Sequence, residues 1–485
     1  MTFSRRALSA LVFVLLLISP VAAAVTPDDY DAATPANLEN DHLYAEAALL
    51  VDMDSGEALL TKNARVRMYP ASTTKIMTLL LALESDIPLD QPVTVPKEAG
   101  NVPKGSSVIG IKPGDVLTWL DLLYGFMLKS GNDGSNAIAV LVSGSIPAFV
   151  ERMNQRAAEL GCEGTHFTNA HGYHDENHYT TAQDLRTISE YAMQNDVFRE
   201  IVGTDRQKIT ITRGSRTASG YAENRNSLLL TDSKYYYEGA TGIKTGHHKQ
   251  AGWCVVASAE RDGVRLMAIV LNCKTEAKKW QDAHKLFNYG FTRYAPFEMR
   301  ALLDHMRAGI CQVTIENADS ADPEGGRMLL EYGNVVNGGA TRMLLRDSES
   351  AIDRACEDIR GEMRIEWSRA LVAPVTAGDV LGTVSFPAPD GTAVTAELVA
   401  SRDVAARAET AEATVPPSMP DASDSGSSLR TMLMILLILL AALVAVLIWL
   451  SVRQRRLAAR RRAARRRGVA SKHAAKPRLN EKGRR

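Results

Sequence analysis

The sequence predicts an α+β protein in which an antiparallel sheet with a helical cluster is followed by a small β-rich domain and one transmembrane helix. Three observations support this prediction. Alternating apolar runs lie near both ends of the first 296 residues, with apolar residues at helical spacing between them. Beyond residue 297 the segments become short, with Gly and Pro turns. An uncharged apolar segment then precedes an arginine-rich tail.

The first domain is expected over residues 42–296. Alternation around turns predicts one hairpin near its start and a second near its end. Apolar positions at helical spacing predict a cluster of helices between the hairpins and one closing helix. In chain order these elements are strands at 45–52 and toward Leu60, helices at 72–82, 120–128, 137–142 and 146–160, a hairpin at 252–272, and a helix at 280–291.

A small β-rich domain is expected over residues 297–404, because segments such as 373–386 and 392–399 alternate between polar and apolar residues. Residues 405–429 are rich in Ala, Pro, Ser and acidic residues, so we expect a flexible linker there.

Both ends of the chain predict export to the cell membrane. Residues 1–24 have two arginines, an apolar run and three terminal alanines, which is the layout of a signal peptide, and residues 25–41 form a polar linker. Residues 430–451 are long enough to cross a bilayer as a helix. The tail, residues 452–485, holds fifteen Lys/Arg against one acid, so the positive-inside rule places it in the cytoplasm and the folded domains outside. Its position favours contact with anionic lipid over binding to nucleic acid.

The first motif that carries chemistry is Ser72-Thr73-Thr74-Lys75. The i, i+3 spacing places Ser72 and Lys75 on one face of a helical turn. A serine hydroxyl needs a base within hydrogen-bonding reach, and a lysine with a lowered pKa can serve. The pair therefore predicts a nucleophile, Ser72, and its general base, Lys75, although a cap residue and a surface lysine would give the same pattern.

Two further motifs follow in order. Ser130-Gly131-Asn132 offers a hydroxyl for proton relay at Ser130 and an amide at Asn132 that can hold both Lys75 and a substrate carbonyl. Lys244-Thr245-Gly246 precedes a predicted strand whose edge can pair with an extended peptide. Lys244 and Thr245 can bind a substrate carboxylate, and Gly246 lets the substrate backbone approach.

The three motifs together resemble those of the low-molecular-mass penicillin-binding proteins that are serine D-alanyl-D-alanine carboxypeptidases of the peptidase S11 type. The resemblance covers roughly residues 42–405. The stretches that carry it are 69–75 (YPASTTK), 127–133 (MLKSGND), 167–173 (FTNAHGY), 178–182 (HYTTA), 242–246 (GIKTG) and 373–382 (APVTAGDVLG).

The resemblance implies a β-lactamase/transpeptidase-like catalytic fold and a peptidoglycan stem peptide as substrate. Ser72 would attack the bond between two D-alanines, and the backbone N–H groups of Ser72 and His247 would hold the oxyanion. Penicillin and other β-lactams would acylate the same serine. No metal or organic cofactor is implied. The chain has lysine at Lys279 and histidine at His247, where the family tends to have arginine and a small polar residue.

Alternatives remain open at this level. A serine β-lactamase uses similar first and third motifs, but the chain lacks an E-x-x-L-N stretch. A D,D-endopeptidase would use the same residues. His171, His174 and His178 have potential as zinc ligands, although no H-E-x-x-H motif is present. A non-catalytic wall-binding protein is disfavoured because all three motifs are intact. The five cysteines show no disulfide framework and are expected to be buried apolar residues.

Overall fold

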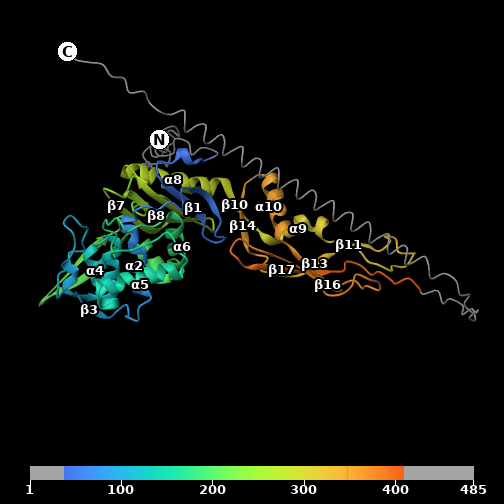
Figure 1. Ribbon diagram of the computed structural model, residues 1–485, viewed down its shortest axis with the longest axis horizontal. Coiled ribbons are helices and arrows are strands. Elements are labelled where there is room, and N and C mark those ends of the chain that lie inside the picture. Colours follow the sequence, from blue (N-terminus) through green and yellow to red (C-terminus); the bar gives the residue numbers. More distant parts are fainter. Residues whose placement is uncertain (1–37, 347, 409–485) are drawn as a thin grey trace, which may run out of the picture. The chain divides into compact units, whose positions relative to one another are not determined.

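The computed structural model describes residues 38–346 and 348–408 (Figure 1). The predicted signal peptide, transmembrane helix and basic tail lie outside these residues, as do most of the two predicted linkers. Within the described residues no single helix is long and apolar enough to cross a membrane, and only the bent pair formed by residues 132–143 and 146–159 meets the length and composition test.

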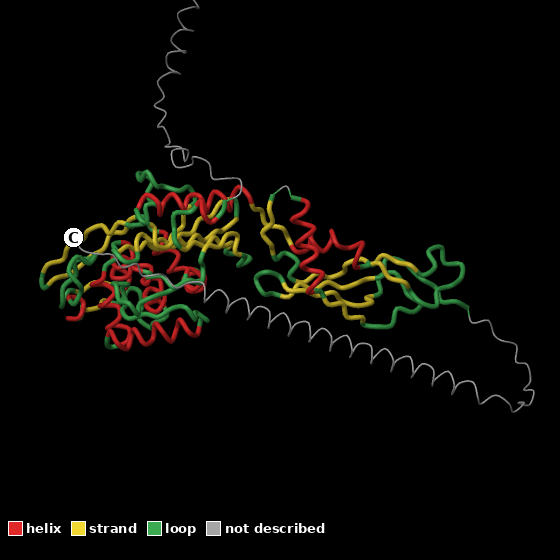
Figure 2. Tube along the Cα trace, turned by 45° about the horizontal axis from the view of Figure 1, so that its top comes forward, coloured by secondary structure: helices red, strands yellow, loops and turns green. Residues whose placement is uncertain are grey.

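A five-stranded antiparallel sheet forms the centre of the first domain, in the order β2-β1-β9-β8-β7. Helix α8 (Glu276–Arg293) covers one face and the helical cluster covers the other (Figures 1 and 2). All six residues of β1 are therefore buried, as expected for a strand covered on both faces. The strands are β1 (Ala47–Asp52), β2 (Ala58–Lys62), β7 (Ala240–His248), β8 (Gly252–Arg261) and β9 (Val264–Cys273).

The helical cluster begins at the first catalytic motif. Its elements are the 3-10 turn η3 (Ala71–Thr74), α2 (Lys75–Leu83), α3 (Trp119–Leu128), α4 (Asn132–Ser143), α5 (Ile146–Glu159), α6 (Ala182–Ala192) and α7 (Asp196–Gly203). Threonine or serine side chains cap α3, α5 and α6 by accepting a backbone N–H, which fixes where these helices start. A second sheet has the order β3-β4-β5-β6 and joins β3 (Pro92–Thr94), β4 (Val116–Thr118), β5 (Arg206–Arg213) and β6 (Arg216–Glu223). Two more 3-10 turns, η2 (Asn40–His42) and η4 (Lys97–Gly100), lie in connecting segments.

Residues 294–346 and 348–408 contain a second apolar core, which lies within residues 299–404. A four-stranded sheet, β13-β17-β16-β15, is accompanied by two helices that the sequence pattern did not predict. The elements are β10 (Tyr294–Glu298), α9 (Met299–Ile310), β11 (Gln312–Thr314), β12 (Arg327–Leu329), β13 (Glu331–Val336), β14 (Thr341–Leu345), α10 (Glu349–Glu362), β15 (Arg364–Trp367), β16 (Val380–Pro387) and β17 (Ala393–Val399).

The predicted elements of the first domain are present, with differences at their ends. The helix expected over 137–142 begins earlier, at Asn132, and the closing helix begins at Glu276 rather than Trp280. In both cases polar residues occupy the first turn, where they do not interrupt a helix but hide its start from an apolar pattern. All five cysteines are buried and unpaired.

Candidate active site

The first motif places a buried amine against a serine hydroxyl. Ser72 lies in η3, and Lys75 begins α2 directly behind it. Lys75 is fully buried, and its Nζ lies 3.2 Å from Ser72 Oγ, 2.8 Å from Asn132 Oδ1 and 2.7 Å from the His171 carbonyl oxygen. Ala71, just before the serine, has a φ of 49°, a left-handed conformation that is uncommon for alanine and is often found at functional sites.

These three contacts suit an amine that exchanges a proton with the serine. The oxygens of Asn132 and His171 can only accept, so they take the two N–H groups of Lys75. The third contact joins Nζ to Ser72 Oγ, and when Lys75 is neutral its lone pair can accept the proton of the Ser72 hydroxyl there. Burial lowers the pKa of Lys75 well below its ordinary value, and the nearby cations Lys244 and Arg225 lower it further. The amine is therefore positioned and tuned to take a proton from Ser72.

The second motif lies at the turn between α3 and α4. Ser130 has a φ of 57° and Asn132 is the first residue of α4. The Asn132 amide accepts a hydrogen bond from Lys75 and donates one to Ser106 Oγ over 3.0 Å. It therefore links the general base to the loop that contains Ser106. The carboxylate of Asp133 fixes that loop by accepting the backbone N–H groups of residues 109, 110 and 111 over 2.8–3.2 Å.

The third motif lies on the edge strand β7. Lys244 is buried, and burial together with Arg225 and Lys279 lowers its pKa to about 7. A Cβ added at Gly246 would lie 2.9 Å from the Pro70 carbonyl oxygen and 3.0 Å from the Ser72 nitrogen. Glycine is thus needed here so that β7 can pack against the nucleophile segment, and the predicted approach of a substrate to Gly246 stays a prediction.

One cavity of about 460 Å³ brings the predicted residues together. Ser72, Ser130, Thr245, Gly246 and His247 line it. Behind this lining the structure buries the other three predicted residues, Lys75, Asn132 and Lys244.

The wall of the cavity beyond the motifs is aromatic and charged, and it includes Glu276, whose carboxylate lies 3.9 Å from Lys279 Nζ. The exposed His247 ring stacks on Trp253 with 3.8 Å between ring centroids. Lys279 Nζ lies 3.7 Å from the Trp280 ring centroid, and burial lowers the pKa of Lys279 to about 8. Arg225 was missed by the sequence analysis. It donates to Ser107 Oγ over 2.9 Å, and no motif marks it because only the fold brings it to the cavity.

The histidine-rich loop supports the site from behind. His178 Nδ1 accepts the Thr168 N–H, so its Nε2–H donates to Thr74 Oγ1 over 2.8 Å, and burial lowers its pKa to about 3. Both ring nitrogens are therefore used within the protein. No group of three or more His, Cys, Asp or Glu side chains suited to a metal ion occurs among residues 38–346 and 348–408. A Cβ at Gly172 would lie only 1.8 Å from the Ala71 carbonyl oxygen, so this loop can pack on η3 only with glycine there.

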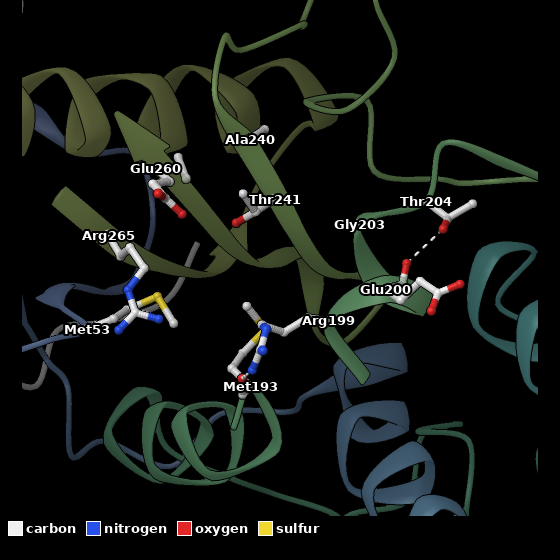
Figure 3. A pocket seen from close by; sticks show the side chains of 11 residues that line it. Met53, Met193, Arg199, Glu200, Gly203, Thr204, Ala240, Thr241, Glu260 and Arg265 are labelled. Carbon is white, nitrogen blue, oxygen red and sulfur yellow. Dashed lines mark hydrogen bonds between the residues drawn. The ribbon is translucent and has the colours of Figure 1, made fainter. Parts of the chain in front are cut away.

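A second cavity, of about 590 Å³, opens near the start of β7 (Figure 3). Met53, Met193, Arg199 and Arg265 are among its lining residues, and none of the predicted site residues lines it. Its arginines are already engaged, because Arg199 pairs with Asp196 and Arg265 with Asp54.

Comparison with known proteins identifies the family. The model of the peptidase S11 family, described as D-alanyl-D-alanine carboxypeptidase, matches residues 33–275. The chain is 31% identical over 365 residues to D-alanyl-D-alanine carboxypeptidase DacC of Escherichia coli, covering 73% of this chain and 82% of DacC. It is also 31% identical over 294 residues to DacF of Bacillus subtilis, covering 60% of this chain and 72% of DacF.

A solved structure supports the fold. The crystal structure of D-alanyl-D-alanine carboxypeptidase DacD from Francisella tularensis is similar with a TM-score of 0.52 at 24% identity, over 76% of this chain and 95% of that chain. The predicted α+β, penicillin-binding type of catalytic fold is thereby confirmed, whereas the predicted domain limits stay a prediction.

Proposed function

Because the chain belongs to the D-alanyl-D-alanine carboxypeptidase family, we propose that it removes the terminal D-alanine of peptidoglycan stem pentapeptides through an acyl-enzyme on Ser72. The observation that carries this proposal is the fully buried Lys75 amine, 3.2 Å from Ser72 Oγ and held by two carbonyl oxygens. An amine in this position, with its pKa lowered by burial, can serve as the base for the serine.

In the first step, Ser72 Oγ bonds to the carbonyl carbon between the two D-alanines while its proton passes to Lys75 Nζ. The carbonyl oxygen becomes an oxyanion, and the backbone N–H groups of Ser72 and His247 would hold it. The 3.0 Å separation between Ser72 N and the Cβ position of Gly246 supports this role, since it places β7 directly beside the serine backbone.

In the second half of acylation the C–N bond breaks and the leaving amine takes a proton from Lys75 through the Ser130 hydroxyl. Thr245, Arg225 and Lys279 line the same cavity and supply a hydroxyl and two cations for the carboxylate of the leaving D-alanine. Water then attacks the ester carbon while Lys75 accepts its proton, the bond between Ser72 Oγ and that carbon breaks, and Lys75 returns the proton to Ser72 Oγ. The shortened peptide leaves with a new carboxylate. A β-lactam would acylate Ser72 by the same first step, with its ring amide in place of the peptide bond.

We further propose that this reaction takes place outside the cell. Residues 1–24 as a signal peptide would export the chain, and residues 430–451 as a membrane helix would hold it, with the tail 452–485 in the cytoplasm. The location fits the proposed substrate, because stem peptides of the wall lie outside the membrane.

The test is release of D-alanine from a soluble pentapeptide by the full-length protein in detergent. Wild type should release one equivalent of D-alanine, and Ser72→Ala should lose about 10⁴-fold or more in rate, as expected when a nucleophile is removed. A wild-type protein that cleaves only crosslinked muropeptides would make it a D,D-endopeptidase instead. Release of D-alanine by Ser72→Ala at the wild-type rate would refute the assigned nucleophile.

A further inference from the structure

The β5–β6 hairpin presents a polar face that the reaction above does not use. β6 is the outer strand of its sheet, and seven of its eight residues are exposed. Along its end, Tyr221, Glu223 and Arg225 are exposed, whereas Ala222 and Asn224 between them are buried. Alternate residues of an extended chain share a face. Tyr221 and Glu223 therefore lie on one face of β6, and the exposed Arg225 follows two residues beyond the end of the strand.

This face leads into the active-site cavity. Arg225 lines the cavity together with Ser72 and donates to Ser107 on the opposite loop. Arg225 lies four positions after Tyr221, so at about 3.3 Å per residue the tyrosine is at most about 13 Å farther out. In the proposed substrate, four residues lie between the glycan and the scissile bond, and an extended tetrapeptide also spans about 13 Å. The glycan of a bound stem peptide can therefore reach the level of Tyr221.

The chemistry of the face suits a sugar polymer that carries acidic peptides. Tyr221 is 62% exposed and offers an apolar ring with a polar edge, while the Arg206 guanidinium lies 4.7 Å from its ring centroid. Lys208 pairs with Tyr221 across the two strands. Farther out, hydroxyls face each other at 2.9–3.0 Å in the pairs Thr210–Ser219 and Thr212–Thr217.

The charge of the β5–β6 hairpin also favours a glycan strand with acidic stem peptides as the partner. Between residues 206 and 223 four Arg/Lys side chains stand against one acid, Glu223, although the chain outside its basic tail is acidic. Arg213 is paired with Asp115, which leaves Arg206, Lys208 and Arg216 as the cations that a partner could meet. A basic hairpin on an acidic protein attracts an anionic polymer. Stem peptides carry free carboxylates, and the glycan strand to which they are attached supplies the rings and hydroxyls that the tyrosine and threonines match.

We propose that this hairpin face binds the amino-sugar strand that carries the scissile stem peptide, so that the enzyme favours glycan-linked pentapeptide over free pentapeptide. The proposal rests on the proposed function. Sugar rings lie on Tyr221, and Arg206 and Lys208 contact carboxylates of the stems.

The test compares kcat/KM of the full-length protein in detergent on free pentapeptide and on the same pentapeptide linked to a short glycan. Tyr221→Ala and the double variant Arg206→Gln/Lys208→Gln should each lose about fivefold to tenfold on the glycan-linked substrate, in the range of a single interface aromatic or cation. Their rates on free pentapeptide should stay within about twofold of wild type, which also shows that the variants fold.

Tyr191→Ala is the matched control, because Tyr191 is 37% exposed and has the Arg156 guanidinium 4.6 Å from its ring centroid, on helix α6. It should leave both rates unchanged. Equal loss on both substrates for Tyr221→Ala, or no loss on either, would overturn the proposal. If wild type releases no D-alanine at all, the proposed function fails, and co-sedimentation with insoluble peptidoglycan decides the hairpin separately. Wild type should then sediment and Tyr221→Ala should not, whereas equal sedimentation refutes the binding face.

Discussion

The substitution Gly172→Ala, compared with a matched control, distinguishes an effect on the geometry of the active site from an effect on the stability of the fold. Gly172 has a φ of 83°, and an added Cβ would lie 1.8 Å from the Ala71 carbonyl oxygen. A carbon and an oxygen that are not bonded need roughly 3.3 Å, so the two segments must separate by about 1.5 Å. The moving loop carries the His171 carbonyl, which lies 2.7 Å from Lys75 Nζ. Since a 1 Å displacement of catalytic groups costs on the order of 100-fold in rate, acylation by fluorescent penicillin should slow by about that factor.

The same change should also lower the free energy of unfolding, by about 1–2 kcal/mol for the left-handed alanine and by about 1–3 kcal/mol more for the overlap. Gly144→Ala is the control: its φ is 75°, but no atom lies within 4 Å of the added Cβ. It should lose only the conformational part of the stability and acylate at the wild-type rate. If Gly172→Ala acylates as fast as wild type, or Gly144→Ala slows equally, the reasoning is refuted.

Two further predictions follow from the buried charges. The acylation rate should rise with pH along a limb well below pH 10.5, because only neutral Lys75 accepts the proton and its pKa is lowered; Arg225→Gln removes a nearby cation and should move that limb to higher pH, and an unmoved limb would contradict it. Asp133→Ala removes the acceptor for three backbone N–H groups of residues 109–111 and should lower the free energy of unfolding by about 3 kcal/mol. Thermal unfolding and proteolysis of that loop measure the effect, and an unchanged melting temperature would count against the anchor.

Local sequence was sufficient to predict the contacts of the site that depend only on the spacing of residues along one helical turn. Ser72 and Lys75 are three residues apart on one turn, so their contact follows from helix geometry alone. The contact of Asn132 with Lys75, 57 residues away, was expected from the chemistry of its amide, and the order of the motifs, which resembles that of a known family, supported the expectation.

Other residues could not be predicted, because only tertiary structure gives them a role. Arg225 reaches the cavity across a loop, and Asp133 follows a motif without belonging to it. The β5–β6 hairpin was missed because β6 buries almost nothing and so lacks an apolar alternation. Gly246 shows a different limit. Close approach of a substrate was predicted there, and the structure adds a close neighbour that the sequence did not show, the protein's own nucleophile segment.

The central claim is that Ser72, activated by Lys75, forms the acyl-enzyme. Mass spectrometry of the protein after incubation with penicillin tests it most directly. We expect one penicilloyl adduct per chain, on the peptide that contains Ser72, and none in Ser72→Ala. An adduct on another residue, or a wild-type protein that takes up no penicillin, would contradict the account.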